Sequence, residues 1–326
     1  MSKPSIPRMR RGTLRRLLVA RWRRSSSAPL PNTRLQLSGP QLVFYTDLVP
    51  SGRRTRLPWA GLGGRVPAAE AQVRWAPGRG RAVALRIWLH EGHDGDPGVL
   101  ALGLELLGFS TWADSKAEVL AKVPAKFSEY SAWRSRHGAP VSLSDSRVEI
   151  VGHAVGNEIL FPPDLEAALA EDIDLAIHLL ASSRADLLAQ LREVPEPVLD
   201  WDPPYRRFAP WADWRTIRAN LAHIANAETH YYTRNIGHQP SVPQADPKGE
   251  WRAFLPASRA MAVAFLETVK SSRDLRRVGT VNHGFGEESW SVRKALRRLV
   301  SHELLHSKSI ARIIRAHAAV NGRGHR

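Results

Sequence analysis

Two histidines and a glutamate near the C-terminus stand at a spacing that suits a metal ion. The stretch VSHELLHSKSI contains His302, Glu303 and His306, which form the His-Glu-x-x-His pattern of zinc peptidases. On an α-helix the two histidines lie one turn apart on the same side, so their imidazoles can share one divalent cation. The same pattern also occurs in metal sites that cleave nothing. The motif alone therefore predicts a metal site but leaves its chemistry open.

The surrounding periodicity places both histidines on the buried side of a helix. At about 100° per residue, His302 and His306 fall in the middle of an apolar stripe, with Glu303 at its flank. Buried imidazole nitrogens need partners, and two protonated rings one turn apart would repel each other. A shared divalent cation resolves both problems. The alternative is a pair of core histidines that are hydrogen-bonded to their neighbours.

The zinc-peptidase interpretation lacks a third ligand. Arg312 stands where that pattern requires a histidine, and no Asp or Glu follows Glu303. The chain has no cysteine, so metal ligands must be histidine or carboxylate, and any thiol must come from outside. We therefore expect the third ligand on an upstream helix. His223 is the preferred candidate, and His178 and His230 are the alternatives.

Four long helices should position these residues. Apolar residues recur at helical spacing over the C-terminal half, with a long polar Pro/Gly-rich connection between the second and third helix, which is typical of a bundle with a crossover. The expected helices span about 164–193, 213–236, 251–272 and 289–319. The segment between the last two is expected to be a loop. Upstream, strands are predicted at 41–49 and 82–91 and a helix at 113–138, which Pro124 should bend or break.

These elements predict an α+β chain of two domains. A basic leader, residues 1–34, is expected to be disordered. A small α/β domain follows over 35–140, then a linker over 141–163 that contains a short strand, then the helical domain over 164–320.

The net charge of +16 is concentrated in the leader, which limits what it implies. The first 27 residues hold eight Arg, one Lys and no acidic residue, so they carry more than half of the net charge. Nucleic-acid binding is therefore expected only through this leader. No apolar run is long enough to span a bilayer. We expect a cytoplasmic protein without membrane contact, and a homodimer is compatible with the sequence.

Two segments resemble the DinB-like superfamily of metalloenzymes. They are WRTIRANLAHIANAETHYY (214–232), with its Leu-x-His-Ile motif, and WSVRKALRRLVSHELLHSKSIARIIR (290–315), with its His-x-x-x-His motif. The resemblance covers roughly 160–320. It implies an up-down-down-up four-helix bundle that holds a divalent metal, most often zinc or nickel. By position, the ligands would be His223, His302 and His306. A departure is Ser307-Lys308-Ser309, where relatives often carry Arg-Gly-Gln.

The resemblance also implies a chemistry. The superfamily includes mycothiol-dependent maleylpyruvate isomerases and bacillithiol S-transferases. We therefore expect a thiol-dependent transferase or isomerase that joins an exogenous low-molecular-weight thiol to a small electrophile. Glu303 is a candidate proton acceptor, or a flanking carboxylate that meets an arginine; Asn220 and Tyr231 are candidate supporting contacts. The alternatives are a metal-dependent hydrolase with Glu303 as general base, and a non-enzymatic binding module.

The N-terminal region is more weakly similar to HicB-like domains. The resemblance rests on two segments: the Leu107-Gly108-Phe109 turn and the helix-like stretch TWADSKAEVLAKVPAKFSEYSAWRSRHG that follows it. The resemblance implies a small α/β accessory module.

Overall fold

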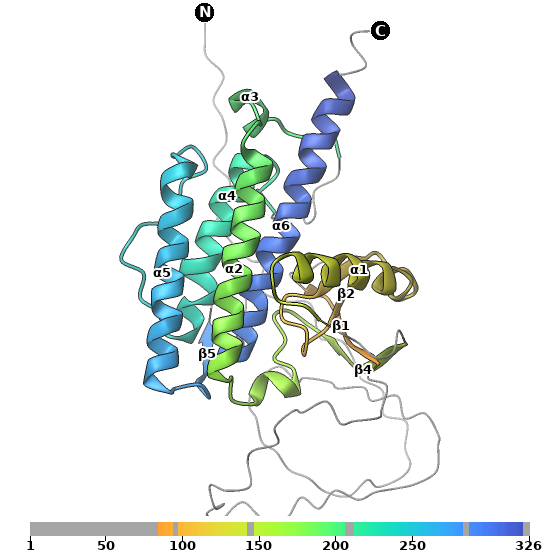
Figure 1. The fold of residues 1–326 in the computed structure, drawn as a ribbon, viewed down its shortest axis with the longest axis vertical. Helices are drawn as coiled ribbons and strands as arrows, with labels where there is room; N and C mark the ends of the chain where they lie inside the picture. The colour runs from red at the N-terminus through yellow and green to blue at the C-terminus, as the bar shows by residue number, and fades with distance from the viewer. Residues whose placement is uncertain (1–83, 94–96, 142–146, 206–211, 283–286, 322–326) are drawn as a thin grey trace, which may run out of the picture. The chain divides into compact units, whose positions relative to one another are not determined.

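The chain is described by a computed structural model over residues 84–93, 97–141, 147–205, 212–282 and 287–321. The basic leader and the predicted strand 41–49 lie outside these residues. All described residues belong to one compact unit, Pro40–Arg326. In it a small sheet precedes a helical part, which confirms the α+β class (Figure 1).

The N-terminal part is a four-stranded sheet in the order β3-β2-β1-β4. Its strands are β1 (Leu85–Glu91), β2 (Val99–Leu102), β3 (Ser110–Ala113) and β4 (Val148–Val155). The first three form an antiparallel meander, whereas β4 pairs with β1 in parallel. A parallel neighbour needs a crossover, which α1 (Lys116–Arg136) provides. The segment predicted as a linker therefore supplies an edge strand of this sheet.

Helix α1 packs its apolar side against the sheet. Val119 and Val123 are fully buried in the same core as Ile87 of β1. The Ser115 side chain accepts a hydrogen bond from the Glu118 backbone N–H at 3.3 Å and so caps the helix. Pro124 was expected to bend or break this helix; α1 continues through it, so the proline does not break the helix. Burial on both sides of the proline outweighs the lost backbone hydrogen bond.

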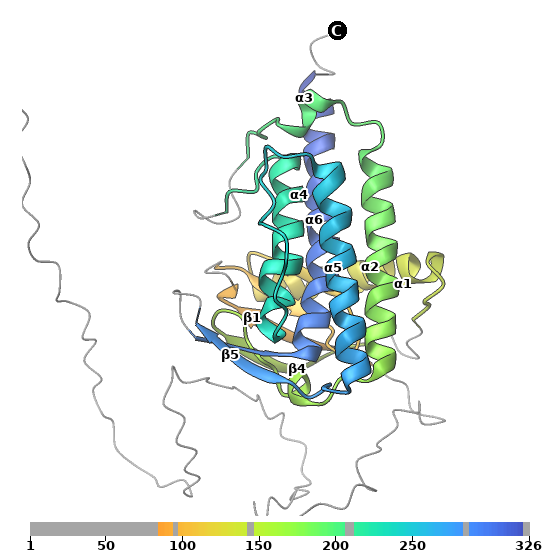
Figure 2. The same ribbon diagram turned by 90° about the vertical axis from the view of Figure 1, so that its left-hand side faces the viewer.

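Four long helices make up the C-terminal part, close to the four ranges predicted. They are α2 (Ala170–Leu191), α4 (Ile217–Asn226), α5 (Trp251–Ser272) and α6 (Val292–Asn321). Both α2 and α4 pack against α5 and α6, and the four helices run alongside one another (Figures 1 and 2). Helix α4 continues into a π-helical turn, η3 (Ala227–Tyr232), and a 3-10 turn, η4 (Arg234–Ile236). Short turns η2 (Pro162–Leu165) and α3 (Glu196–Leu199) flank α2.

The loop expected between the last two helices is instead a β-hairpin. Strand β5 (Val278–Asn282) pairs antiparallel with β6 (Glu287–Ser291), which leads directly into α6. Trp290 of β6 is fully buried, with its ring 5.3 Å from that of Tyr231. Burial of this indole by a distant helix stabilises strand geometry that the local sequence predicts only weakly.

Among the described helices, none combines the length and the apolar character that crossing a membrane requires.

Candidate metal centre

Three histidines from two helices converge at the centre of the helical part. One ring nitrogen from each of His223, His302 and His306 lies within 4.8 Å of the other two. The Nε2 atoms of His223 and His302 are 2.9 Å apart. Two imidazole nitrogens this close either share a proton or face a common cation. This is the only such group of histidine or acidic side chains among the residues that the structure describes.

The helix faces predicted from periodicity position these rings. On α6, His302 and His306 are each 8% exposed and follow the buried Leu299. On α4, Leu221 and Ile224 fix the buried side of the helix, and His223 is only partly buried beside it. Because His223 is at the border of the buried side of α4, its convergence with the other two histidines depends on how α4 and α6 pack.

Burial keeps the three imidazoles neutral. It is the main cause that lowers the pKa of His223, to about 4, with the charge of Arg298 adding to it. Burial also lowers the pKa of His302 and His306 well below 6.5, and the neighbouring rings and Arg298 lower it further. A neutral imidazole presents a lone pair that can bind a metal ion. The donor set, two buried imidazoles and one partly buried imidazole, all neutral, therefore fits a divalent cation.

Two further side chains support the cluster. Asn220 is 1% exposed, and its Oδ1 lies 2.7 Å from Nδ1 of His306. The indole of Trp214 stacks on His223 with ring centroids 3.7 Å apart and meets His306 edge-on. The sequence analysis named Asn220 as a supporting contact but did not connect Trp214 with the histidines. Trp214 stands just before the helix that carries His223, and this position in the sequence could have indicated a contact between the two rings.

The alternative ligands lie elsewhere. His178 is exposed, and its Nε2 donates to the backbone oxygen of His137 at 2.6 Å. His230 is in the π-helical turn and is not part of the histidine cluster. The structure thus brings together the three histidines that the sequence analysis preferred.

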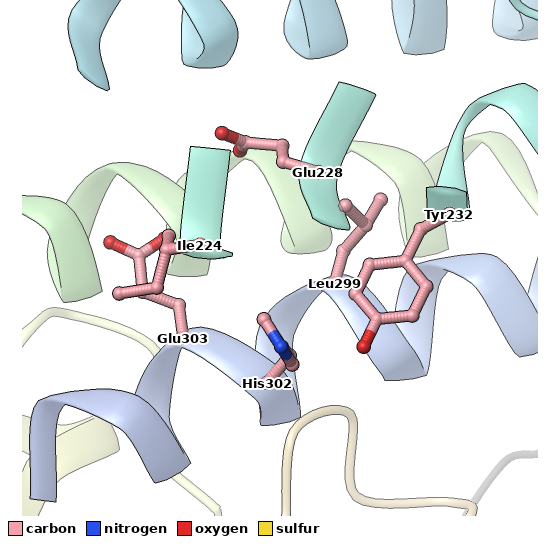
Figure 3. Close-up of a pocket in the computed structure, with 6 residues that line it drawn as sticks. All are labelled: Ile224, Glu228, Tyr232, Leu299, His302 and Glu303. Atoms are coloured by element: carbon pink, nitrogen blue, oxygen red, sulfur yellow. The ribbon is translucent and has the colours of Figure 1, made fainter. Parts of the chain in front are cut away.

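The carboxylate of Glu303 pairs with arginines and not with the histidine cluster. Its side chain is 1% exposed. Its Oε1 accepts a hydrogen bond from Arg184 Nε at 2.8 Å, and its Oε2 pairs with Arg259. Figure 3 shows the two neighbouring side chains leaving α6 in different directions. The carboxylate is held by two arginines, which is the flanking role that the sequence analysis gave as the alternative to proton acceptor.

A narrow crevice, too small to admit a water molecule, borders this region. Its walls combine two carboxylates, a phenol ring, an imidazole and two aliphatic side chains (Figure 3). They come from Ile224, Glu228, Tyr232, Leu299, His302 and Glu303. The Tyr232 ring meets His302 edge-on, with centroids 5.1 Å apart. The Tyr232 ring therefore covers part of the His302 imidazole.

Comparison with known proteins identifies one related family. Residues 179–310, which contain all three histidines, match the family model of the DinB superfamily. This segment is therefore DinB-like. No curated protein matches the chain, and no solved structure matches it. The family match does not reach the N-terminal sheet, so the resemblance to HicB-like domains remains a prediction.

Proposed function

We propose that the helical part of this chain is a metal-binding domain in which His223, His302 and His306 hold one divalent cation, zinc or nickel. The convergence of three neutral imidazoles from two helices, two of them buried and one partly buried, supports this most directly. Imidazole suits both metals. We also interpret the four packed helices as the up-down-down-up bundle of DinB-like proteins, and the N-terminal sheet as its accessory module.

We further propose a thiol-dependent transferase or isomerase activity. A cation held by three neutral ligands keeps its full charge and an open position, and it would lower the pKa of a thiol bound there. The chain has no cysteine, so the thiol would be a diffusible cosubstrate. Trp214 and Tyr232 would exclude water from the ring nitrogens, because their rings cover His223 and His302. The second substrate would be a small electrophile.

The hydrolase alternative has less support. It requires Glu303 to accept a proton from water beside the metal. Both oxygens of that carboxylate already pair with arginines. A role that holds α6 in place suits this environment better than proton transfer does.

Elemental analysis of the purified protein tests the metal centre. We expect about one zinc or nickel ion per chain in the wild type and near-complete loss in His302→Ala and in His306→Ala. His178→Ala is the matched control, since this exposed histidine on α2 bonds only to a backbone oxygen in the described structure. Equal metal content in all four proteins would refute the site.

Fluorescence with monochlorobimane tests the thiol chemistry. In this reaction the thiol sulfur forms a bond to carbon, chloride leaves, and the thiol proton passes to solvent. We expect turnover that requires both a low-molecular-weight thiol and bound metal, and that His306→Ala abolishes. A rate equal to the uncatalysed reaction with each thiol tested would contradict the transferase proposal but not the metal centre.

A further inference from the structure

The side chain of Asn220 makes hydrogen bonds in two directions. Its Nδ2 lies 2.7 Å from the backbone oxygen of Trp214 and 2.8 Å from that of Thr216. Its Oδ1 lies 2.7 Å from Nδ1 of His306. At 1% exposure the amide has no solvent to compete for these contacts. Every polar position of the amide that the structure describes thus has a defined partner.

These partners determine which way the amide points. Backbone oxygens only accept hydrogen bonds, so the atom that faces Trp214 and Thr216 must be the nitrogen, which has two N–H groups to donate. The opposite atom, which faces His306, must then be the oxygen. The reversed amide would place its oxygen against two backbone oxygens, none of which has a proton to donate.

The oxygen in turn determines the proton on the histidine. An amide oxygen has no hydrogen, so the contact with His306 requires an N–H at Nδ1. A neutral imidazole carries one such proton. With that proton on Nδ1, the lone pair of the ring must be on Nε2. We propose that Asn220 is a positioning residue that fixes His306 in the tautomer whose Nε2 binds the metal. This inference rests on the proposed metal centre.

The Asn220 amide also contacts Trp214, the residue whose indole covers the second proposed ligand, His223. The backbone of Trp214 is bonded to Asn220, and its indole stacks on His223 at 3.7 Å. Asn220 therefore restrains the His306 ring directly. It restrains the indole that stacks on His223 through the backbone of Trp214. Partners of this kind orient ligand rings, and their loss typically weakens metal binding by about 10- to 100-fold.

Nitrogen-15 NMR of histidine side chains tests the tautomer in wild-type protein without metal. We expect the His306 ring to show a protonated Nδ1 and an unprotonated Nε2, with the resonance assigned by its disappearance in His306→Gln. A ring with its proton on Nε2 would overturn the proposal. This measurement needs no substitution at Asn220, so a folding defect cannot obscure it.

Zinc affinity by competition with a chelator tests the consequence. We expect Asn220→Ala to bind zinc about 10- to 100-fold more weakly and Asn220→Asp to retain most of the wild-type affinity. Aspartate keeps an oxygen acceptor for His306 but cannot donate to Trp214 and Thr216. If Asn220 acted only through those backbone contacts, the aspartate variant would bind no better than the alanine variant, and the proposal would fail.

Asn226 provides the matched control. It lies on the same helix, and its amide bonds to the backbone of Ala245 at 2.9 Å and 2.6 Å, without contact to a histidine ring. Asn226→Ala should bind zinc like the wild type; a loss as large as that of Asn220→Ala would refute a specific role. If the wild type itself binds no zinc, the metal centre fails, while the tautomer of His306 still decides the inference about Asn220.

Discussion

Burial controls the protonation of histidines away from the cluster of His223, His302 and His306 as well. His90 on β1 is 3% exposed, and its Nε2 donates to the backbone oxygen of Gly156 at 2.8 Å. Burial lowers its pKa from 6.5 to about 4, against the opposing effects of the Gly156 contact and of Glu158. Arg297 and Arg298 lower the pKa further. Protonation of this ring would place a third positive charge next to the two arginines.

This environment predicts a pH-dependent contribution to stability. Because the pKa of His90 is about 4 when folded and 6.5 when unfolded, the unfolded chain takes up its proton first on acidification. The contribution is fully present above pH 6.5 and is lost as pH falls to about 4. It amounts to about 3 kcal/mol. Urea unfolding over this range should show a steeper loss in wild type than in His90→Gln, which keeps a donor for Gly156 but does not titrate. Parallel curves would contradict the prediction.

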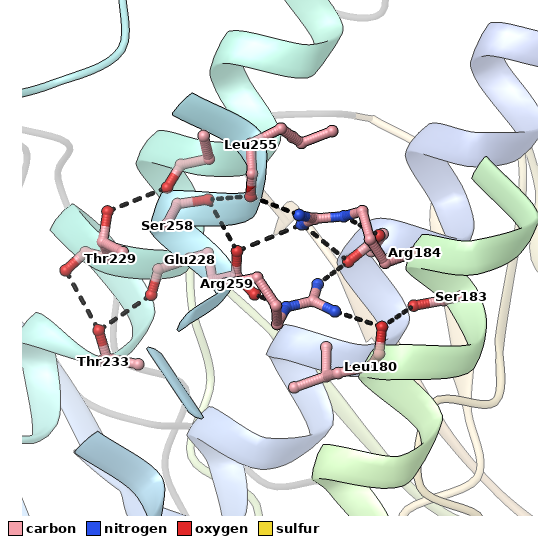
Figure 4. A network of polar contacts seen from close by, with 11 residues as sticks. Leu180, Ser183, Arg184, Glu228, Thr229, Thr233, Leu255, Ser258 and Arg259 are labelled. Atoms are coloured by element: carbon pink, nitrogen blue, oxygen red, sulfur yellow. Dashed lines mark hydrogen bonds and ion pairs between the residues drawn. The ribbon is translucent and has the colours of Figure 1, made fainter. Parts of the chain in front are cut away.

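At the scale of elements, a buried ion network joins helices α2, α5 and α6 to the π-helical turn (Figure 4). Arg184 of α2 bonds to Glu303 at 2.8 Å and to Glu228 at 3.3 Å. Arg259 of α5 pairs with both carboxylates. Burial would raise the pKa of Glu228, but Arg259 and Arg184 outweigh it and lower the pKa. Glu228 anchors η3, a rare helix type that often marks functional sites, and Glu303 anchors α6 next to His302.

Removing one arginine should therefore destabilise the protein strongly. Arg184→Ala leaves two buried carboxylates with a single guanidinium, and such a loss typically costs about 3–5 kcal/mol. We expect a corresponding fall in the free energy of unfolding by urea. Arg218→Ala is the control, because Arg218 pairs with the exposed Glu196 and Asp200 and exposed pairs contribute little. If both variants lost a similar free energy of unfolding, the buried network would stabilise the protein no more than the exposed pairs do.

At the scale of the whole compact unit, the turn between β2 and β3 packs onto the helix that carries His302 and His306. Gly108, in the turn between β2 and β3, has φ of +93°, and a Cβ there would lie 2.5 Å from Cγ1 of Val300 on α6. The Tyr130 hydroxyl of α1 donates to the oxygen of Leu107 at 2.6 Å and holds the same turn. Only glycine permits this approach.

Substitution of this glycine should measure the packing. Gly108→Ala must accept a left-handed backbone and a clash with α6, whereas Gly138→Ala, at φ +71°, meets nothing within 4 Å. The backbone cost is about 1–2 kcal/mol in both, and the clash should add about 1–3 kcal/mol in Gly108→Ala alone. Thermal unfolding of the two variants checks the difference. Equal shifts would mean that the turn does not pack tightly on α6.

A second link between the parts comes from the segment predicted as a linker. Glu158 pairs with Lys294 at 3.3 Å and with Arg298 at 2.7 Å, both on α6. All three side chains are buried. Burial would raise the pKa of Glu158, but the two cations outweigh it and lower the pKa. The domain boundaries drawn from the sequence remain a prediction. A helical fragment that begins between residues 158 and 164 would lack Glu158 and leave Lys294 and Arg298 without this carboxylate.

The local period of the sequence determined the helices, the buried side of α6 and the two histidines on it, because hydrophobic spacing and capping act within a few residues of the chain. The resemblance to DinB-like proteins pointed to His223 as well. Only the tertiary structure decided the partners that come from distant segments. It paired β4 in parallel with β1, ordered the hairpin around Trp290, turned Glu303 toward two arginines and placed Asn220 behind His306. These outcomes depend on which buried groups satisfy one another across the core, and that information is not contained in any short stretch of sequence.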